Sequence, residues 1–330
     1  MLRLILSRLL QALLALLLIS TLTFSLLAAV GGDALTALRV DPLISEESIR
    51  RLSRVYNLDQ PLHLRYARWV SGLLLRGDLG QSFFYQSSVW SVLKPRLSST
   101  LLLASAALMM AVACSALLGA ASARRPNSLI DRFCGLVILL TASTPRIVLA
   151  LAALALIASM PAAADRAFQT TPGSFSWRGA SGDVWQLCLA AFVLSVPLVA
   201  IFLGQTRDAL KAALALDFVR VARAKGLSER AVLFRHALRA ALNPLITTFG
   251  YSLGSLMSGS VVVETILNWP GLGQLSVTAV RNRDVPLLMG VVMLTSAAVL
   301  LGNLLADVLQ HLSDPRLRRA ADSARKSSPA

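Results

Sequence analysis

The chain has 330 residues, of which 55% are hydrophobic and only 15% charged, and its mean hydropathy is +0.66. A soluble domain carries about a quarter charged residues, so a single water-soluble core does not fit this composition. The net charge of +15 indicates either an anionic partner, such as nucleic acid, or an uneven distribution of charge across a membrane.

Apolar residues are grouped into six stretches without Asp, Glu, Lys or Arg, each close to the ~20 residues that a helix needs to cross a bilayer. The stretches are Leu9–Val30, Leu97–Ala123, Ile147–Ala164, Val184–Thr206, Ala240–Val263 and Val285–Ala306. They predict an all-α, polytopic membrane protein of about six transmembrane helices. 

The first stretch has two interpretations. Arg3 and Arg8 precede it, and Ala29-Val30-Gly31 matches a small-residue cleavage site, as in a signal peptide. Its uncharged run exceeds the ~7–15 residues of a signal-peptide core. We therefore favour an uncleaved first span, with the signal peptide as the alternative.

Residues 31–96 form a segment too long for a simple connector. Ser45 is a candidate N-cap for a short amphipathic helix within Asp41–Asn57, and a second helix is expected over His63–Leu75. The sequence Gly77-Asp78-Leu79-Gly80 is typical of a turn. We expect a small helical domain here, outside the cytoplasm.

The second span is rich in small residues, which let membrane helices approach closely. They are Ser105, Ala106, Ala107, Ala111, Ala113, Ser115, Ala116, Gly119 and Ala120. We expect this helix to pack against protein rather than lipid.

The third span contains Pro145, which predicts a kink, followed by Arg146. If the span begins near Phe133, Arg146 lies within the membrane, at a cost of ~2.5–3.5 kcal/mol, and is a candidate pathway residue. If it begins near Pro145, Arg146 lies at the cytoplasmic interface. The second placement is the preferred prediction.

Lys and Arg are concentrated in segments that alternate along the chain. With a cytoplasmic N-terminus, residues 1–8, 124–132, 207–239 and the tail after Leu312 carry 18 of the 32 basic residues and six acidic ones. The opposite side carries 13 basic and ten acidic residues. This bias is the usual topological signal, so both termini are expected in the cytoplasm. No aromatic-interleaved basic platform supports nucleic-acid binding, which we exclude.

The loop from Arg207 to Leu242 is far longer than the ~2–8 residues that connect bundle helices. A first helix is expected to run to about Lys225, where Gly226 ends it. Ser228 then N-caps a second helix. Such a helix–Gly–helix unit favours docking into a partner; an interfacial loop on anionic lipid is the alternative.

The sequence DFVRVARAKGLSERAVLFRHALRAALNPL in this loop resembles the EAA loop of ABC-importer permeases, in the form seen in the dipeptide/oligopeptide/nickel family. ETILNWPGLGQL, after the fifth span, and YNLDQPLHLRYARWVSGLLLRGDLGQS, after the first, also resemble the B-type permease subunit of that family. The resemblance covers about Leu9 to Arg318 in the same order.

The resemblance implies a type I ABC-importer permease fold and a loop that couples the spans to a cytoplasmic ATPase. The matched coupling positions are Ala222, Arg223, Ala224, Lys225, Gly226 and Leu227. Implied partners are a second (C-type) permease subunit, two cytoplasmic ABC ATPase subunits, a periplasmic solute-binding protein and the lipid bilayer. The chain is expected to bind no cofactor itself, the ATP being used by the partner subunits.

Three positions depart from the general pattern. Arg220 stands where the general motif has a glutamate, as is usual for this subfamily, Arg146 replaces an apolar residue, and Asn243 replaces a commoner leucine. A simple salt-bridge account of docking, and the details of the solute pathway, are therefore not transferred.

The implied domains are the first span (1–30), a periplasmic domain (31–96), a transmembrane domain of five helices (97–311) with its coupling loop at 207–242, and a basic cytoplasmic tail (312–330). The expected location is the bacterial inner membrane. The solute, a peptide or a related small solute such as nickel, cannot be chosen from the sequence.

Other functions have weaker support. The chain lacks a P-loop, a metalloprotease motif and a cysteine–histidine cluster, so it is expected to be a transport subunit without an ATPase site, and no metal site is predicted. A G-x-S-x-G match at Gly250–Gly254 lies inside a span, where small residues for helix packing explain it better than a catalytic elbow. An ion-driven secondary transporter would need acidic residues within spans, and Glu264 and Asp307 lie only at span ends.

Overall fold

The structure, a computed structural model, describes residues 2–30, 45–55, 59–159 and 180–313. Within these ranges the chain is helical apart from turns and one isolated antiparallel bridge between Gln81 and Ser88. The all-α prediction is confirmed. The basic tail beyond Ser313 lies outside the described residues.

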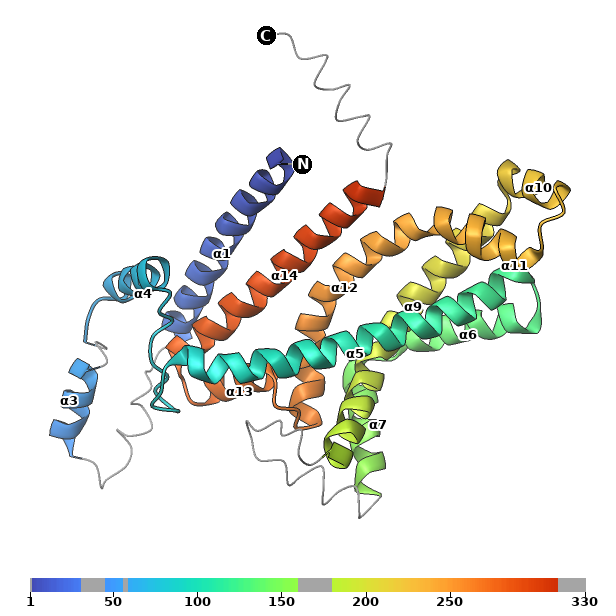
Figure 1. Ribbon diagram of the computed structural model, residues 1–330. Helices are drawn as coiled ribbons and strands as arrows, with labels where there is room; N and C mark the ends of the chain where they lie inside the picture. The colour runs from blue at the N-terminus through green and yellow to red at the C-terminus, as the bar shows by residue number, and fades with distance from the viewer. Residues whose placement is uncertain (1, 31–44, 56–58, 160–179, 314–330) are drawn as a thin grey trace, which may run out of the picture. The chain divides into compact units, whose positions relative to one another are not determined.

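Five of the described helices are long and apolar enough to cross a membrane. They are α1 (Leu2–Val30), α5 (Val89–Arg124), α9 (Ala180–Leu214), α12 (Leu238–Ile266) and α14 (Val285–Ser313) (Figure 1). A sixth span is formed if α6 (Leu129–Ser143) and α7 (Arg146–Ala158) are counted together, although they meet at an angle of 96°. The predicted number of spans is confirmed, and the break lies at Pro145, where a kink was predicted.

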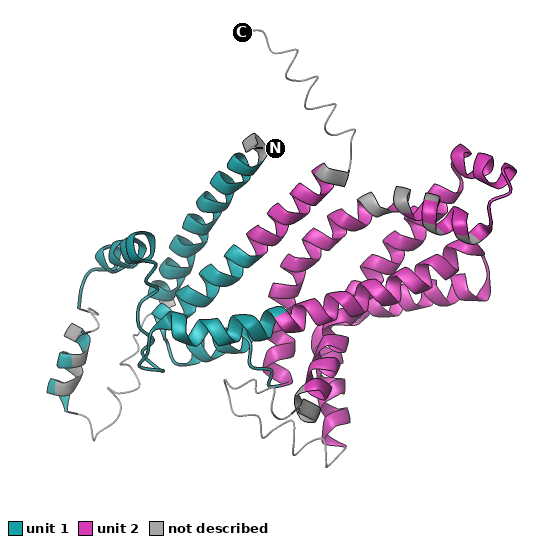
Figure 2. Ribbon diagram, viewed as in Figure 1, with its two compact units in different colours: residues 1–101, 170–176, 268–298 teal, residues 102–169, 177–267, 299–330 magenta. Residues whose placement is uncertain are grey.

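The chain divides into two compact units (Figure 2). Unit 1 comprises residues 1–101, 170–176 and 268–298, and unit 2 comprises residues 102–169, 177–267 and 299–330. The boundaries fall within α5 and α14, so each of these helices contributes to both units.

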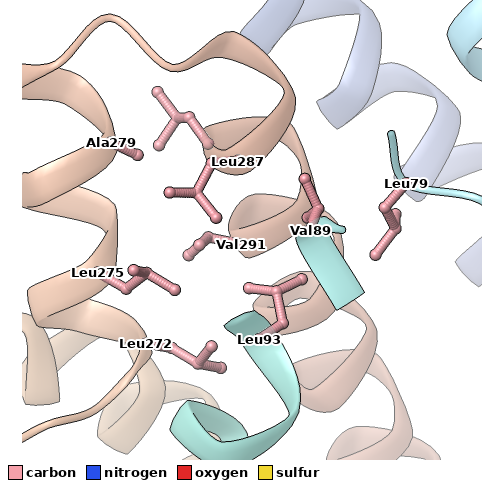
Figure 3. Packing of buried hydrophobic residues seen from close by; sticks show 9 residues of the cluster. Leu79, Val89, Leu93, Leu272, Leu275, Ala279, Leu287 and Val291 are labelled. Atoms are coloured by element: carbon pink, nitrogen blue, oxygen red, sulfur yellow. The ribbon is translucent and has the colours of Figure 1, made fainter. Parts of the chain in front are cut away.

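Unit 1 contains α1, α3 (Glu46–Val55), α4 (Leu62–Arg76), α13 (Leu272–Arg281) and the first parts of α5 and α14. The two short helices predicted after the first span are thus present as α3 and α4, and Gly77 (φ +64°) and Gly80 (φ +91°) form the predicted turn. An apolar core joins the turn to α5, α13 and α14 (Figure 3). Its buried residues are Leu79, Val89, Leu93, Leu272, Leu275, Ala279, Leu287, Leu288 and Val291.

A buried carboxylate supports this core. Asp284, immediately before α14, accepts hydrogen bonds from the Ser82 hydroxyl (2.5 Å) and the Phe84 amide (3.1 Å) through Oδ2. Its Oδ1 accepts one from the Leu287 amide (3.1 Å), which is a side-chain cap on the first turn of α14. Asp284 therefore fixes the segment before α5 to the start of the last span.

Unit 2 contains α6, α7, α9, α12 and the remaining parts of α5 and α14. On α5, the small residues at every fourth position are buried, namely Ala107, Ala111, Ser115 and Gly119. A Cβ atom on Gly119 would lie 2.8 Å from Thr206 Cγ2 of α9, so the close approach of these helices requires glycine. The predicted packing of the second span against protein holds for this face of α5, whereas Ser105, Ala113 and Ala116 are exposed.

The G-x-S-x-G match lies within α12, as predicted from its place in an uncharged span. Ser252 is buried, and its hydroxyl donates to the Thr248 carbonyl oxygen (2.8 Å), one turn earlier. A Cβ atom on Gly250 would overlap Ala306 of α14. These residues allow close helix packing, and the strand-to-helix turn of a catalytic elbow is absent at this position.

Candidate functional site

The segment between α9 and α12 contains three short helical elements, α10 (Asp217–Ala224), α11 (Glu229–Ala231) and the π-helical η2 (Val232–Ala237) (Figure 1). The prediction of one continuous helix up to Lys225 was wrong. The Ala215 and Leu216 amides donate to the Ala212 and Ala213 carbonyl oxygens (both 3.2 Å), and these three-residue spacings tighten and end α9. The chain then changes direction before α10 begins.

The turn after α10 has the predicted form. Gly226 has φ of +77°, a left-handed conformation that glycine adopts without a Cβ penalty. The Ser228 hydroxyl accepts a hydrogen bond from the Ala231 amide (3.3 Å), so the predicted N-cap is confirmed. From Glu229 the chain continues through α11 and η2 into α12 without a break in helical structure.

The loop is attached to the spans through two buried apolar clusters. In the first, Val219 and Ala222 of α10 pack with Val232 of η2. The second consists of Ala123, Leu210, Ala213, Leu233, Ala237 and Ala241, which come from α5, α9, η2 and α12. Leu214 of α9 packs against both clusters, so a continuous path of side-chain contacts leads from α10 to three of the long helices.

Among the six predicted coupling positions, Ala222 is the one that is buried within the loop itself. It is buried against the chain's own Val219 and Val232, so its side chain faces inward and not toward a partner. The reason is the amphipathic period of α10, which places Val219 and Ala222, three residues apart, on one face. The other five predicted positions are exposed.

The outer surface of the loop combines apolar and basic residues. Its large apolar side chains are between 42% and 54% exposed: Leu216, Phe218, Val221 and Leu227. Its exposed basic residues are Arg220, Arg223 and Lys225. Phe218 and Val221 were not among the predicted coupling residues, but reading Val219 and Ala222 as the inner face of α10 would have placed them on the outer one.

Two ion pairs lie within this surface. Arg223 donates to both carboxylate oxygens of Glu229 (2.8 and 3.2 Å), which links α10 to α11 across the Gly226 turn. Arg220, which stands where the general EAA motif has a glutamate, lies 3.5 Å from Asp217. Both pairs are exposed and contribute little to stability. The Asn243 side chain lies outside the described residues.

A buried ionic cluster holds the same end of unit 2 together. Asp131 of α6, whose side chain is 4% exposed, pairs with Arg207 (2.7 Å) and Lys211 (2.9 Å) of α9. It also accepts hydrogen bonds from the Ser122 hydroxyl of α5 (2.6 Å) and the Asn127 amide (2.9 Å). In the sequence analysis, Arg207 and Lys211 served only to assign the cytoplasmic side. They lie four residues apart on α9 and so share one face of the helix, a spacing that could have indicated a common acidic partner.

Next to this cluster, a hollow of about 330 Å³ separates α10 from the loop between α5 and α6. Its lining residues are Ala123, Arg124, Pro126, Lys211, Leu214, Ala215, Arg223, Glu229 and Leu233. The basic segments 124–132 and 207–239, both predicted to be cytoplasmic, therefore lie side by side.

Arg146 is not placed as preferred from the sequence. Its guanidinium donates to Ser255 Oγ (2.8 Å) and lies against Gly259, where a Cβ atom would overlap it. Ser255 is at the centre of the candidate span Pro244–Ile266 of α12. This contact favours the intramembrane alternative and does not fit a position at the cytoplasmic interface, because α7 turns at Pro145 and packs along α12.

Within the described residues, no group of three or more His, Cys, Asp or Glu side chains has the arrangement of a metal site. Cys134 is buried and its thiol lies 3.6 Å from the Leu118 carbonyl oxygen, as expected for a packing residue, whereas Cys114 and Cys188 are exposed in the isolated chain.

Long apolar helices, together with a helical loop mounted on three of them, define a polytopic membrane protein. Residues 115–319 match the family described as "Binding-protein-dependent transport system inner membrane component", and residues 1–104 match the N-terminal component of the same systems. The chain belongs to this family.

Similar proteins cover nearly the whole chain. It is 34% identical to the oligopeptide transport system permease protein AppB of Bacillus subtilis, over 91% of this chain and 94% of the relative. The di/tripeptide permease DppB of Pseudomonas aeruginosa (33%) and the dipeptide permease DppB of Escherichia coli K12 (30%) align over the same shares. These matches confirm the resemblance to B-type permeases, and identify a membrane transport subunit.

Proposed function

We propose that this chain is the B-type permease subunit of a peptide ABC importer in the bacterial inner membrane. A periplasmic binding protein delivers the solute, a second, C-type permease completes the pathway, and two cytoplasmic ATPase subunits supply the energy. The observation that carries the proposal is the apolar and basic outer face of α10, mounted by buried contacts on α5, α9 and α12. Peptides are favoured over nickel because the relatives named above are peptide permeases.

The outer face of α10 supports ATPase docking. Exposed Phe218 and Val221 lie three residues apart, and they would be desolvated in an apolar groove of a partner. Arg220 and Lys225 flank them and orient the contact. If the loop instead lay on anionic lipid, the buried contacts that attach α10 to the spans would not be required, because a surface helix needs no rigid connection to the spans.

The proposed topology places both termini and residues 207–242 in the cytoplasm, with residues 31–96 in the periplasm. The proximity of the basic segments 124–132 and 207–239 supports this assignment, since both carry the positive charge typical of the inner side. Residues 97–311 form the remaining transmembrane domain, and residues 312–330 the tail.

An ion-driven secondary transporter is the alternative function. Glu264 is fully buried in the last turn of α12. An acidic residue at the end of a span does not by itself indicate ion coupling. An ABC importer uses ATP and a secondary transporter uses an ion gradient, so a measurement of which one drives uptake distinguishes the two functions.

The deciding experiment is reconstitution in liposomes. This chain, its C-type partner and the two ATPases should co-purify, and should take up a labelled dipeptide only with the binding protein outside and ATP inside. Nickel uptake measured in the same vesicles decides the solute class. Uptake by this chain alone, driven by an ion gradient without ATP, would refute the proposal.

The turn at Gly226 gives a first variant. Gly226→Val forces a β-branched residue to a φ of +77°, at a cost of about 1–2 kcal/mol, although no atom within 4 Å obstructs a Cβ atom. We expect ATP-driven uptake to fall several-fold at an unchanged amount of protein in the membrane. Gly226→Asn, which tolerates this φ, is the control and should retain most uptake. An equal loss in both variants would indicate steric exclusion of the partner and not backbone strain; full uptake in Gly226→Val would contradict a coupling role.

A further inference from the structure

The guanidinium of Arg146 lies beside the middle of α12 in unit 2. It donates to Ser255 Oγ of α12, and Ser255 is 11 residues from each end of the candidate span Pro244–Ile266. At 1.5 Å per residue this is about 16 Å of helix on either side, which is farther than an arginine side chain extends. The charge therefore cannot reach either membrane surface along α12.

The described residues around Arg146 leave space for the guanidinium and accept a hydrogen bond from it, but none of them forms an ion pair with it. Gly259, one turn after Ser255, leaves the space that the guanidinium fills. The one hydrogen bond that the described residues show for this side chain goes to a neutral hydroxyl, and none of their ion pairs includes it. The residues that follow it on α7, Ile147 and Val148, are exposed apolar side chains.

An arginine within a membrane span is costly and is retained where it binds an anion or faces a polar pathway. The guanidinium has five N–H donors, arranged to fit a carboxylate through two parallel hydrogen bonds. Ser255 uses one of them. Because the side chain is half-buried, the remaining donors are available to a carboxylate that enters the site.

We propose that Arg146, positioned by Ser255 and Gly259, binds the C-terminal carboxylate of the peptide during its passage and so selects for peptides with a free C-terminus. This inference rests on the proposed function, which supplies a solute with one such group. A permanent carboxylate from the C-type subunit is the competing source of the anion.

The test is uptake by the complete reconstituted importer of a dipeptide and of the same dipeptide with a C-terminal amide. Uptake by each variant is divided by wild-type uptake of the same peptide, so that the preference of the binding protein cancels. Arg146→Gln should lose about tenfold of its relative uptake of the free dipeptide and much less for the amide. Arg146→Lys, which keeps the charge, should recover part of the difference. An equal effect of Arg146→Gln on both peptides, or no effect, would overturn the proposal.

Two further variants separate binding from structure. Gly259→Ala keeps the charge but displaces the guanidinium, and should shift the acid-to-amide ratio in the same direction as Arg146→Gln. Ser255→Ala removes one of the two positioning contacts and should shift the ratio in the same direction, but less than Gly259→Ala. If Arg146→Gln instead abolishes co-purification with the C-type subunit, the anion belongs to that subunit and the solute role is wrong. Failure of the wild-type complex to take up either peptide would refute the proposed function, and this inference with it.

Discussion

Asp131→Asn is expected to destabilise unit 2 by about 3 kcal/mol, the lower end of the cost of removing one partner from a buried ion pair. The variant leaves Arg207 and Lys211, which are 26% and 27% exposed, facing a neutral amide. Their partial exposure lets water compensate in part, which is why the lower end applies. The unfolding temperature of the protein in lipid nanodiscs should fall by several degrees.

Asp208→Asn is the matched control. Asp208 lies beside Arg207 on α9 and is exposed, so this variant removes the same charge without uncovering buried cations, and its unfolding temperature should change little. Adding Lys211→Met to Asp131→Asn removes one of the two cations and should restore part of the lost stability. Equal unfolding temperatures for Asp131→Asn and Asp208→Asn would show that the buried cluster does not hold the three helices together.

Val221→Asp is expected to lower ATP-driven peptide uptake at least tenfold while the protein remains in the membrane at its normal level. Val221 is 54% exposed on the outer face of α10, so a carboxylate is well solvated in the free loop. Docking into an apolar groove would remove that solvation at a cost of several kcal/mol, and each 1.4 kcal/mol corresponds to tenfold in the binding equilibrium. The measurement is uptake, together with the amount of ATPase that co-purifies.

Leu129→Asp provides the control for Val221→Asp. Leu129 is exposed at the start of α6, where an added carboxylate favours the positive helix end, and uptake should stay close to the wild-type value. Val221→Leu, which preserves the apolar surface, should do the same. Normal uptake in Val221→Asp would mean that the outer face of α10 is not the ATPase contact.

The spans were predictable because each depends on a local property, a long uncharged run. The break at Pro145, the N-cap at Ser228 and the Gly226 turn were predictable for the same reason, since each follows from the chemistry of one or two residues. The end of α9 before Asp217 was missed because Ala215 and Leu216 are good helix formers, and the break depends on packing of α10 against η2.

The candidate site was predicted less completely, because its geometry depends on contacts between distant residues. Ala222 faces inward only because Val232 covers it. Asp131 receives its partners from a helix about 80 positions further along the chain. Arg146 has its depth fixed by Ser255, 109 positions away. None of these pairings has a local pattern that a single sequence displays.

The uninterrupted helical run from Glu229 to Ile266 connects the residues on which α10 is mounted to the part of α12 that contacts Arg146. Its first turns carry the buried side of the α10 mount, and Ser255 and Gly259 lie farther along the same axis. A displacement of α10 would therefore be transmitted through η2 to α12 and would change the position of α12 beside the Arg146 guanidinium. ATP hydrolysis at the cytoplasmic side and release of a bound carboxylate within the membrane would then be coupled through the movement of one helix.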